Sequence, residues 1–97
     1  MVYTHGTWIA KPGREEEFVA RWLELGEWTT ENFPAARGTL ARDVDEPSRF
    51  VSFGPWPTRG HAERWRASEG FGERVARVLE TVETFEPRTL QLVAEVS

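Results

Sequence analysis

Aromatic rings are the most distinctive side chains of this sequence that could take part in chemistry. Six phenylalanines and one tyrosine accompany five tryptophans in only 97 residues: Trp8, Trp22, Trp28, Trp56 and Trp65. An indole buries a large flat surface, but its N–H group then needs a hydrogen-bond acceptor. The rings therefore either fill an interface or line a pocket for a flat apolar ligand.

Two histidines, His5 and His61, could accept a proton near neutral pH. His61 falls among charged residues in the first turn of a predicted helix, so a solvated surface residue is the simpler interpretation. His5 suits an interface better than the role of a base. Two isolated histidines do not have the spacing of a metal site, and the absence of Cys excludes disulfides and thiolate chemistry. We expect no metal and no cofactor.

Length and charge indicate a single domain over residues 1–97 and exclude several classes of protein. The net charge is −4, and the basic residues form no stripe, so we expect no nucleic-acid partner. No apolar run is long enough to cross a membrane. The start of the chain, Met1 to Gly6, lacks the basic and apolar regions of a secretory signal, so we expect a cytoplasmic protein.

The elements that must position these residues can be predicted from periodicity. We expect strands over residues 2–10, 38–44, 49–53 and 89–96, with a first helix over about 13–30. Thr58 is a candidate N-cap for a helix through Ala67, and Ser68 for a second one. Helical spacing then continues through Phe71, Val75, Val78, Val82 and Phe85, until Pro87 ends the helix.

This order, β-α-β-β-α-β, predicts an α+β, ferredoxin-like fold with a four-stranded antiparallel sheet and both helices on one face. Helices on one face leave the other face open. That open face is expected to be strongly apolar, because it would carry Tyr3, His5, Val51, Phe53, Leu90 and Leu92. A patch of this kind marks an interaction surface, so we expect a homodimer packed sheet against sheet.

Three segments resemble one known family. Residues 8–18, WIAKPGREEEF, are similar to the strand-to-helix entry of antibiotic biosynthesis monooxygenase (ABM) domains. Residues 49–56, RFVSFGPW, resemble the third strand of that family with its terminal Trp. Trp65, Ser68 and Phe71 match a motif of its helical segment. The resemblance implies a dimeric α/β barrel with a cavity between helices and sheet in each subunit.

The activities of the family include cofactor-independent oxygenation of polycyclic phenols, quinol oxidation and haem degradation. The haem-degrading members resemble this chain at Trp65. They need a His where Val75 stands, as the iron ligand, and an Asn where Gly6 stands. Two of the three key positions are lost, so the resemblance does not favour haem degradation.

The resemblance instead implies oxidation of a phenol or quinol-type aromatic substrate by molecular oxygen. Such a site needs a dry slot, a base and a hydrogen-bond donor. Our candidate catalytic residues are Trp65 as donor, His61 as base and Asn32 to orient the substrate. Strand alternation places Thr4, Gly6 and Trp8 at the cavity, and the absent side chain of Gly6 would leave room for a ligand. The remaining candidates for substrate binding are Trp22, Trp28, Phe33 and Phe71.

Two other hypotheses remain open. The same cavity could serve a non-catalytic ligand-binding or stress-response protein. Alternatively, the rings could all be core of a structural dimerisation domain, since Phe18, Trp22 and Leu25 at helical spacing are typical of a core.

Overall fold

The computed structural model describes residues 1–97, which form four strands and three helices. In chain order these are β1 (Val2–Ala10), α1 (Glu15–Asn32), β2 (Thr39–Arg42), β3 (Arg49–Trp56), α2 (Arg59–Ala67), α3 (Glu69–Leu79) and β4 (Val82–Gln91). Gly13, whose φ angle is +85°, turns the chain between β1 and α1. No helix is long and apolar enough to cross a membrane.

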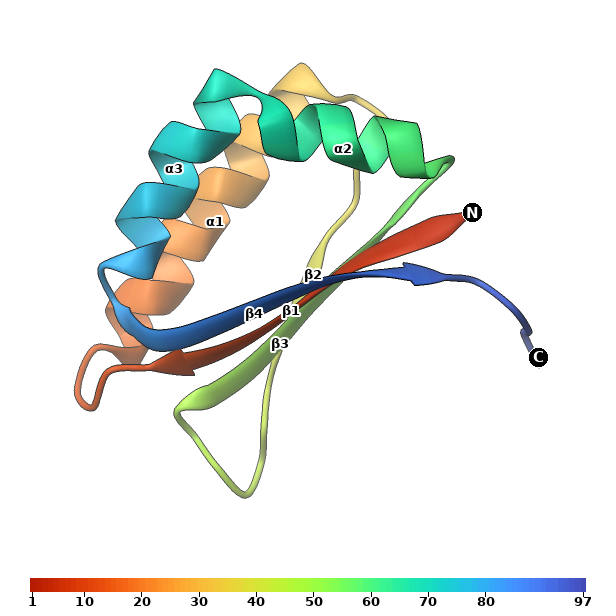
Figure 1. Cartoon of the computed structure of the whole chain (residues 1–97). Coiled ribbons are helices and arrows are strands. Elements are labelled where there is room, and N and C mark those ends of the chain that lie inside the picture. The colour runs from red at the N-terminus through yellow and green to blue at the C-terminus, as the bar shows by residue number, and fades with distance from the viewer.

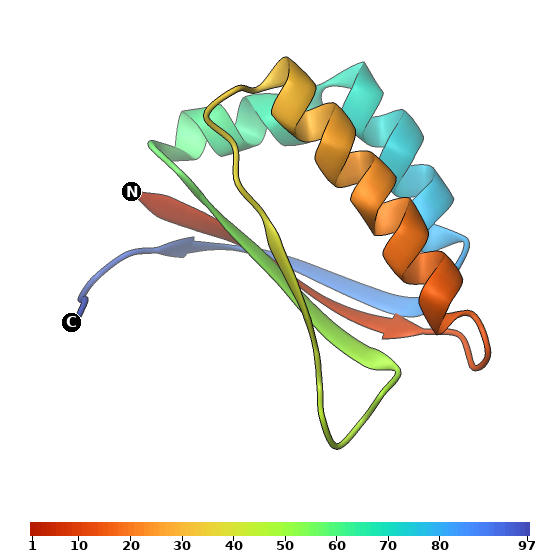
Figure 2. The ribbon, with the colours of Figure 1, turned by 180° about the vertical axis from the view of Figure 1, so that it is seen from behind.

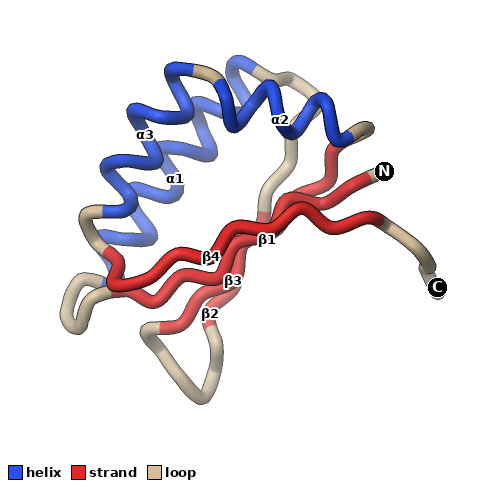
Figure 3. Tube along the Cα trace, in the orientation of Figure 1, coloured by secondary structure: helices blue, strands red, loops and turns tan.

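The strands form one antiparallel sheet in the order β2-β3-β1-β4, and the helices cover a single face of it (Figures 1 and 2). The predicted ferredoxin-like arrangement is therefore confirmed. Figure 3 shows the two layers, with the opposite face of the sheet left uncovered. Strand β1 lies in the middle of the sheet and pairs with both β3 and β4 along most of its length.

The second helical segment is divided at Ser68, where the sequence predicts a second cap. The side chain of Thr58 accepts a hydrogen bond from the backbone N–H of His61, which begins α2. Ser68 then accepts one from the N–H of Phe71 and begins α3. Each hydroxyl satisfies a donor that the first turn of a helix leaves without a partner. The break lets α2 and α3 point in different directions over the sheet (Figure 1).

The predicted continuation of this helix through Phe85 is wrong, because α3 ends at Leu79. The backbone N–H and the hydroxyl of Thr81 both donate to the carbonyl of Val78, at 3.0 and 2.6 Å, which closes the last turn. Val82 and Phe85 belong to β4, opposite Ala10 and Trp8 of β1. Long-range pairing with β1 overrides a helical spacing that arises by coincidence.

Two prolines lie inside strands, although the sequence predicts that Pro55 follows the end of a strand and that Pro87 ends a helix. β3 continues past Phe53 to Trp56, and β4 begins at Val82 and not at Thr89. Pro55 is tolerated because β2 pairs with β3 only as far as Phe53, which leaves the rest of β3 without a neighbour on that side. Pro87 is tolerated because β4 is an edge strand.

The side chains that face the helices form two separate apolar clusters. The first joins the sheet to α1 and α3 and consists of Trp8, Ala10, Phe18, Leu25, Phe50, Val78 and Val82. The second, under α2, consists of Ala36, Trp56 and Ala62, with Val2, Phe33 and Trp65 against it. Two clusters in place of one continuous core leave a gap between them.

Two glycines of α3 provide a matched test of how closely α1 packs on α3. A Cβ atom at Gly70 would lie 2.1 Å from Cζ2 of Trp28, whereas one at Gly72 would meet nothing within 4 Å. We expect Gly70→Ala to lower the free energy of unfolding by about 1–3 kcal/mol through overpacking. Gly72→Ala should raise it by about 0.5–1 kcal/mol through helix propensity. Urea unfolding of both variants measures the difference, and equal stabilities would contradict the close packing of Trp28.

Candidate functional site

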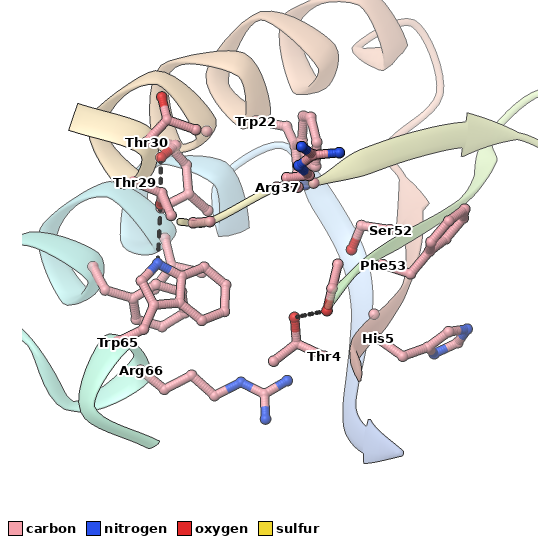
Figure 4. Close-up of a pocket in the computed structure, with 18 of the residues that line it drawn as sticks. Thr4, His5, Trp22, Thr29, Thr30, Arg37, Ser52, Phe53, Trp65 and Arg66 are labelled. Atoms are coloured by element: carbon pink, nitrogen blue, oxygen red, sulfur yellow. Dashed lines mark hydrogen bonds between the residues drawn. The ribbon is translucent and has the colours of Figure 1, made fainter. Parts of the chain in front are cut away.

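A cavity of about 310 Å³ lies between the sheet and the helices, within the size range of small-ligand pockets. Its floor is the inward face of β1 and β3, where it is bordered by Thr4, Gly6, Trp8 and Ser52 (Figure 4). The helices contribute the apolar side chains of Trp22, Leu25, Trp65, Phe71 and Val75, together with the hydroxyl of Thr29. Residues of both apolar clusters border the cavity, so it occupies the gap between them.

Hydroxyl groups hold three of the indole rings at the cavity. The N–H groups donate from Trp8 to Ser52 Oγ at 2.9 Å, from Trp56 to Thr4 Oγ1 at 3.3 Å, and from Trp65 to Thr29 Oγ1 at 2.9 Å. A buried indole without such a partner would lose the hydrogen bond that its N–H makes with water. Each pair therefore fixes a large ring at its polar edge and presents apolar ring surface to its surroundings.

Trp65 forms an aromatic wall of the cavity. Its ring centroid lies 5.2 Å from that of Trp56 and 4.6 Å from that of Phe71. Its acceptor, Thr29, in turn donates its own proton to the carbonyl of Leu25 at 2.8 Å. The N–H group of Trp65 is thus already paired within the protein. In this arrangement Trp65 offers a flat apolar surface to a ligand and has no free donor.

Gly6 is needed for packing at the opposite side of the cavity. A Cβ atom there would lie 2.9 Å from Phe85 and 3.0 Å from both Ser52 Oγ and Trp8 Nε1. The ring of Phe85 stacks on Trp8 at a centroid distance of 3.8 Å. The space left by the missing side chain, which we expected to admit a ligand, is therefore used by the hydrogen bond from Trp8 to Ser52 and by Phe85.

Ser52 differs from the other hydroxyl residues around the cavity. The hydroxyls of Thr4, Thr29 and Thr30 each donate to a backbone carbonyl. Ser52 accepts from Trp8, and its own proton has no acceptor in the protein. It is therefore free to donate to a ligand. Ser52 is not among the site residues that the sequence predicts, although alternation along β3 places it on the same face as Phe50 and Trp56.

Six of the predicted site residues border the cavity: Thr4, Gly6, Trp8, Trp22, Trp65 and Phe71. His5 and Phe53 also touch it, but Figure 4 shows their side chains pointing away from Trp65. The predicted division of β1 into even residues toward the helices and odd residues toward the open face agrees with the burial along the strand.

His61 and Asn32, the predicted base and orienting residue, do not border the cavity. His61 is exposed, and its ring nitrogen Nδ1 lies 2.6 Å from the hydroxyl of Thr58. Asn32 is exposed at the end of α1, where its side-chain amide donates to the carbonyl of Trp28 at 2.9 Å. Both polar groups are engaged with the ends of their own helices, away from a ligand in the cavity.

Trp28 and Phe33, two predicted substrate-binding residues, also lie outside the cavity lining. Trp28 packs on Gly70 of α3 and carries the guanidinium of Arg74 over its ring at 5.0 Å. Phe33 lies between Trp28 and Trp56, at centroid distances of 6.0 and 5.9 Å. Their rings join α1 to α3 and to the end of β3, which is a structural role.

Few charged groups border the cavity, and they are Glu27, Arg37 and Arg66 in addition to the outward-facing His5. Arg66 extends from α2 to β4, where Nη1 donates to Thr89 Oγ1 at 2.6 Å and Nη2 to the carbonyl of Arg88 at 2.9 Å. Partial burial of its guanidinium lowers the pKa of Arg66 below the usual value for arginine.

The cavity offers no ligand set for a metal ion or haem iron. Val75, at the position where the haem-degrading members of the resembling family need a His, borders the cavity with an apolar side chain. No group of three or more His, Asp or Glu side chains lies close enough together to hold a metal ion.

The hydrogen bond between Thr29 and Trp65 can be tested by removing its acceptor. Thr29→Val leaves the indole N–H of Trp65 without a partner, so we expect the free energy of unfolding to fall by about 1–3 kcal/mol. Thr29→Ser retains the hydroxyl oxygen and should lose clearly less. Chemical denaturation of the two variants compares them. A Ser variant as unstable as the Val variant would show that this bond does not hold Trp65.

Comparison with known proteins assigns the family. Residues 1–77 match the family model described as antibiotic biosynthesis monooxygenase. One solved structure with this description has a TM-score of 0.82 at 22% identity, over 97% of this chain and 100% of the other.

Two further structures extend the likeness. The cofactor-independent oxygenase SnoaB from Streptomyces nogalater has a TM-score of 0.86 at 19% identity, over 98% of this chain and 95% of the other. A conserved protein from Methanosarcina mazei Go1 has a TM-score of 0.83 at 16% identity, over 93% of this chain and 90% of the other. No curated protein matches the sequence. Identities this low show a common fold alone. The family model, however, covers most of the chain, so the chain belongs to the antibiotic biosynthesis monooxygenase family.

Proposed function

We propose that the protein is a cofactor-independent monooxygenase that oxidises a flat aromatic substrate, a polycyclic phenol or a quinol, with molecular oxygen. The observation that carries this proposal is the cavity walled by aromatic rings, with the free hydroxyl of Ser52 on its floor. Family membership supports the reaction class, and SnoaB is itself a cofactor-independent oxygenase.

The chemistry needs little from the protein beyond this setting. A deprotonated phenol or enol is rich enough in electrons to react with oxygen directly. With anthrone as an example, the methylene carbon is oxidised to a carbonyl: one oxygen atom forms the new C=O bond and the other leaves as water with the two methylene hydrogens. A dry apolar slot strengthens each polar contact, and Ser52 would donate to the substrate oxygen that carries the negative charge.

One observation favours a second candidate, a ligand-binding protein without catalysis. The N–H group of Trp65 is already paired. His5 and Glu27 border the cavity, but His5 points away from Trp65 and Glu27 is exposed, so neither is placed as a base. Under the first proposal, the substrate must therefore enter as an anion or lose its proton to water. Under the second, the same cavity binds a flat ligand and releases it unchanged.

A variant that fills the cavity separates these functions from a purely structural role. A Cβ atom at Gly26 would meet only Trp22, at 4.0 Å, so a side chain can start there without a close contact. Because Gly26 borders the cavity, Gly26→Leu should lower kcat/KM for anthrone oxidation by about tenfold or more. Gly72→Ala, on the exposed surface of α3, serves as the control.

Oxygen uptake with anthrone and quenching of tryptophan fluorescence measure the two activities on the same samples. Uptake by the wild type that Gly26→Leu lowers supports the oxygenase. Quenching that Gly26→Leu weakens, with no uptake, supports the binding protein. If no flat apolar compound gives either oxygen uptake or quenching, both functions are contradicted and a structural domain remains.

We also propose that two copies of the chain pack through their open sheet faces. The side chains on this face include the apolar Tyr3, Ile9, Val51, Phe53, Pro55 and Leu90, next to the polar His5, Thr7, Glu86 and Arg88. Phe53 is 41% exposed and Leu90 is 45% exposed. Beside Phe53 in the pairing register, Nδ1 of His5 is enclosed without a hydrogen-bond partner. Exposed apolar side chains beside an unpaired polar atom are typical of a surface that a partner covers.

A charge on this face should separate the copies. We expect the wild type to sediment as a dimer and Phe53→Arg as a monomer, because a second copy cannot bury an unpaired guanidinium. Val44→Arg, at a site that is 93% exposed in the loop between β2 and β3, should leave the dimer intact. Analytical ultracentrifugation measures the mass, and a monomeric wild type at micromolar concentration would contradict the proposal.

A further inference from the structure

Arg66 differs from every other arginine of the chain in its surroundings. Seven arginines form ion pairs with acidic side chains, and Arg66 is not among them. The other three arginines without an acidic partner, Arg37, Arg42 and Arg64, are exposed, whereas Arg66 is partly buried. A cation that is partly withdrawn from water and has no counter-charge is costly, so it indicates a missing anion.

The position of Arg66 places that missing anion at the cavity. Arg66 borders the cavity and follows Trp65, the aromatic wall, directly in the sequence. Figure 4 shows its side chain extended from the helix toward the sheet, below Thr4 in this view. Its two hydrogen bonds go to neutral oxygens of β4, the hydroxyl of Thr89 and the carbonyl of Arg88. They fix the group at the sheet edge and leave three of its five N–H donors without a protein acceptor.

The remaining charges near the cavity do not neutralise Arg66. Glu27 is exposed on α1 and forms no ion pair with it. Arg37 is itself a cation and cannot neutralise Arg66. It precedes the edge strand β2, whereas Arg66 binds the opposite edge strand, β4. The Arg66 side of the cavity therefore combines an aromatic wall with one unpaired cation.

We infer that the ligand of this cavity is a flat aromatic anion whose carboxylate or enolate oxygen is bound by Arg66. The inference rests on the cavity being the ligand site of the proposed function, and it adds the charge of the ligand. Charge-assisted hydrogen bonds from a guanidinium to an anionic oxygen are about twice as strong as neutral ones. Arg66 is a binding residue in this account and takes no proton from the substrate.

Two pairs of probes test the inference and distinguish the two kinds of anion. The carboxylate pair is 1-hydroxy-2-naphthoate and its methyl ester. The enolate pair is 2-hydroxy-1,4-naphthoquinone, an anion at pH 7, and its methyl ether. Tryptophan fluorescence titrations at pH 7 give a Kd for each probe with the wild type, Arg66→Gln, Arg66→Lys and Arg64→Gln. Arg64→Gln is the matched control, since Arg64 is an exposed arginine of the same helix.

We expect the wild type to bind the anion of at least one pair about tenfold more tightly than its neutral partner. Arg66→Gln should abolish this preference and leave the Kd of the neutral probe nearly unchanged. Arg66→Lys should retain part of the preference, and Arg64→Gln all of it. No preference in the wild type for either anion, or a preference that survives in Arg66→Gln, would overturn the inference.

The outcome can be separated from folding and from the oxygenase proposal. Circular dichroism and thermal unfolding identify a variant that fails to fold, and Thr89→Val then tests the site while retaining the arginine. Loss of its anchor on β4 should weaken the anion preference, and an unchanged preference would contradict the geometry. A preference for the anion without oxygen uptake supports the inference and contradicts only the oxygenase. Oxygen uptake with neutral substrates alone, without a preference for the anion, supports the oxygenase and contradicts the inference.

Discussion

Three hydrogen bonds from indole N–H groups to hydroxyl oxygens hold the aromatic walls of the cavity in place. Trp8, Trp56 and Trp65 each require an acceptor, and Ser52, Thr4 and Thr29 provide one from a neighbouring strand or helix. These bonds set the direction of each ring, because an indole has a single donor at one edge. The ring surfaces therefore border a cavity in place of a closed core. Two of the acceptors send their own protons to backbone carbonyls, so only Ser52 retains a donor for a ligand.

Close contacts at glycine support this arrangement from both sides. Gly6 allows the ring of Phe85 and the hydrogen bond between Trp8 and Ser52 to lie close to β1, where a Cβ atom would contact both. Gly70 allows Trp28 to lie directly on α3, so that α1 and α3 form one layer. Gly54 allows the carbonyl of Arg37 to approach β3, since a Cβ atom there would lie 2.1 Å from that oxygen. Because these three positions carry no side chain, the neighbouring strands and helices pack closely around the cavity and the cavity stays open.

Local signals predicted much of the fold, and long-range contacts account for the errors. The strand from Val2 to Ala10 and the caps at Thr58 and Ser68 follow from short patterns, and the structure has all three. Helical spacing predicts a helix at Phe85. Its true pairing, with Trp8, depends on a residue far away in the chain, which local spacing does not show. The lining of the cavity was predicted where strand alternation or helix spacing applied. The same patterns miss Ser52, whose role depends on its partner Trp8. They wrongly place His61 and Asn32 at the site, because these side chains bind the ends of their own helices.

A crystal structure of the protein with 1-hydroxy-2-naphthoate would show whether the aromatic walls enclose a preformed site for a flat ligand. We expect the naphthalene ring in the cavity against Trp65, with its hydroxyl oxygen near Ser52 and its carboxylate at Arg66. The indole hydrogen bonds should be unchanged. A cavity closed by collapse of Trp65 and Phe71, or a ligand bound only on the outside of the molecule, would contradict a preformed site.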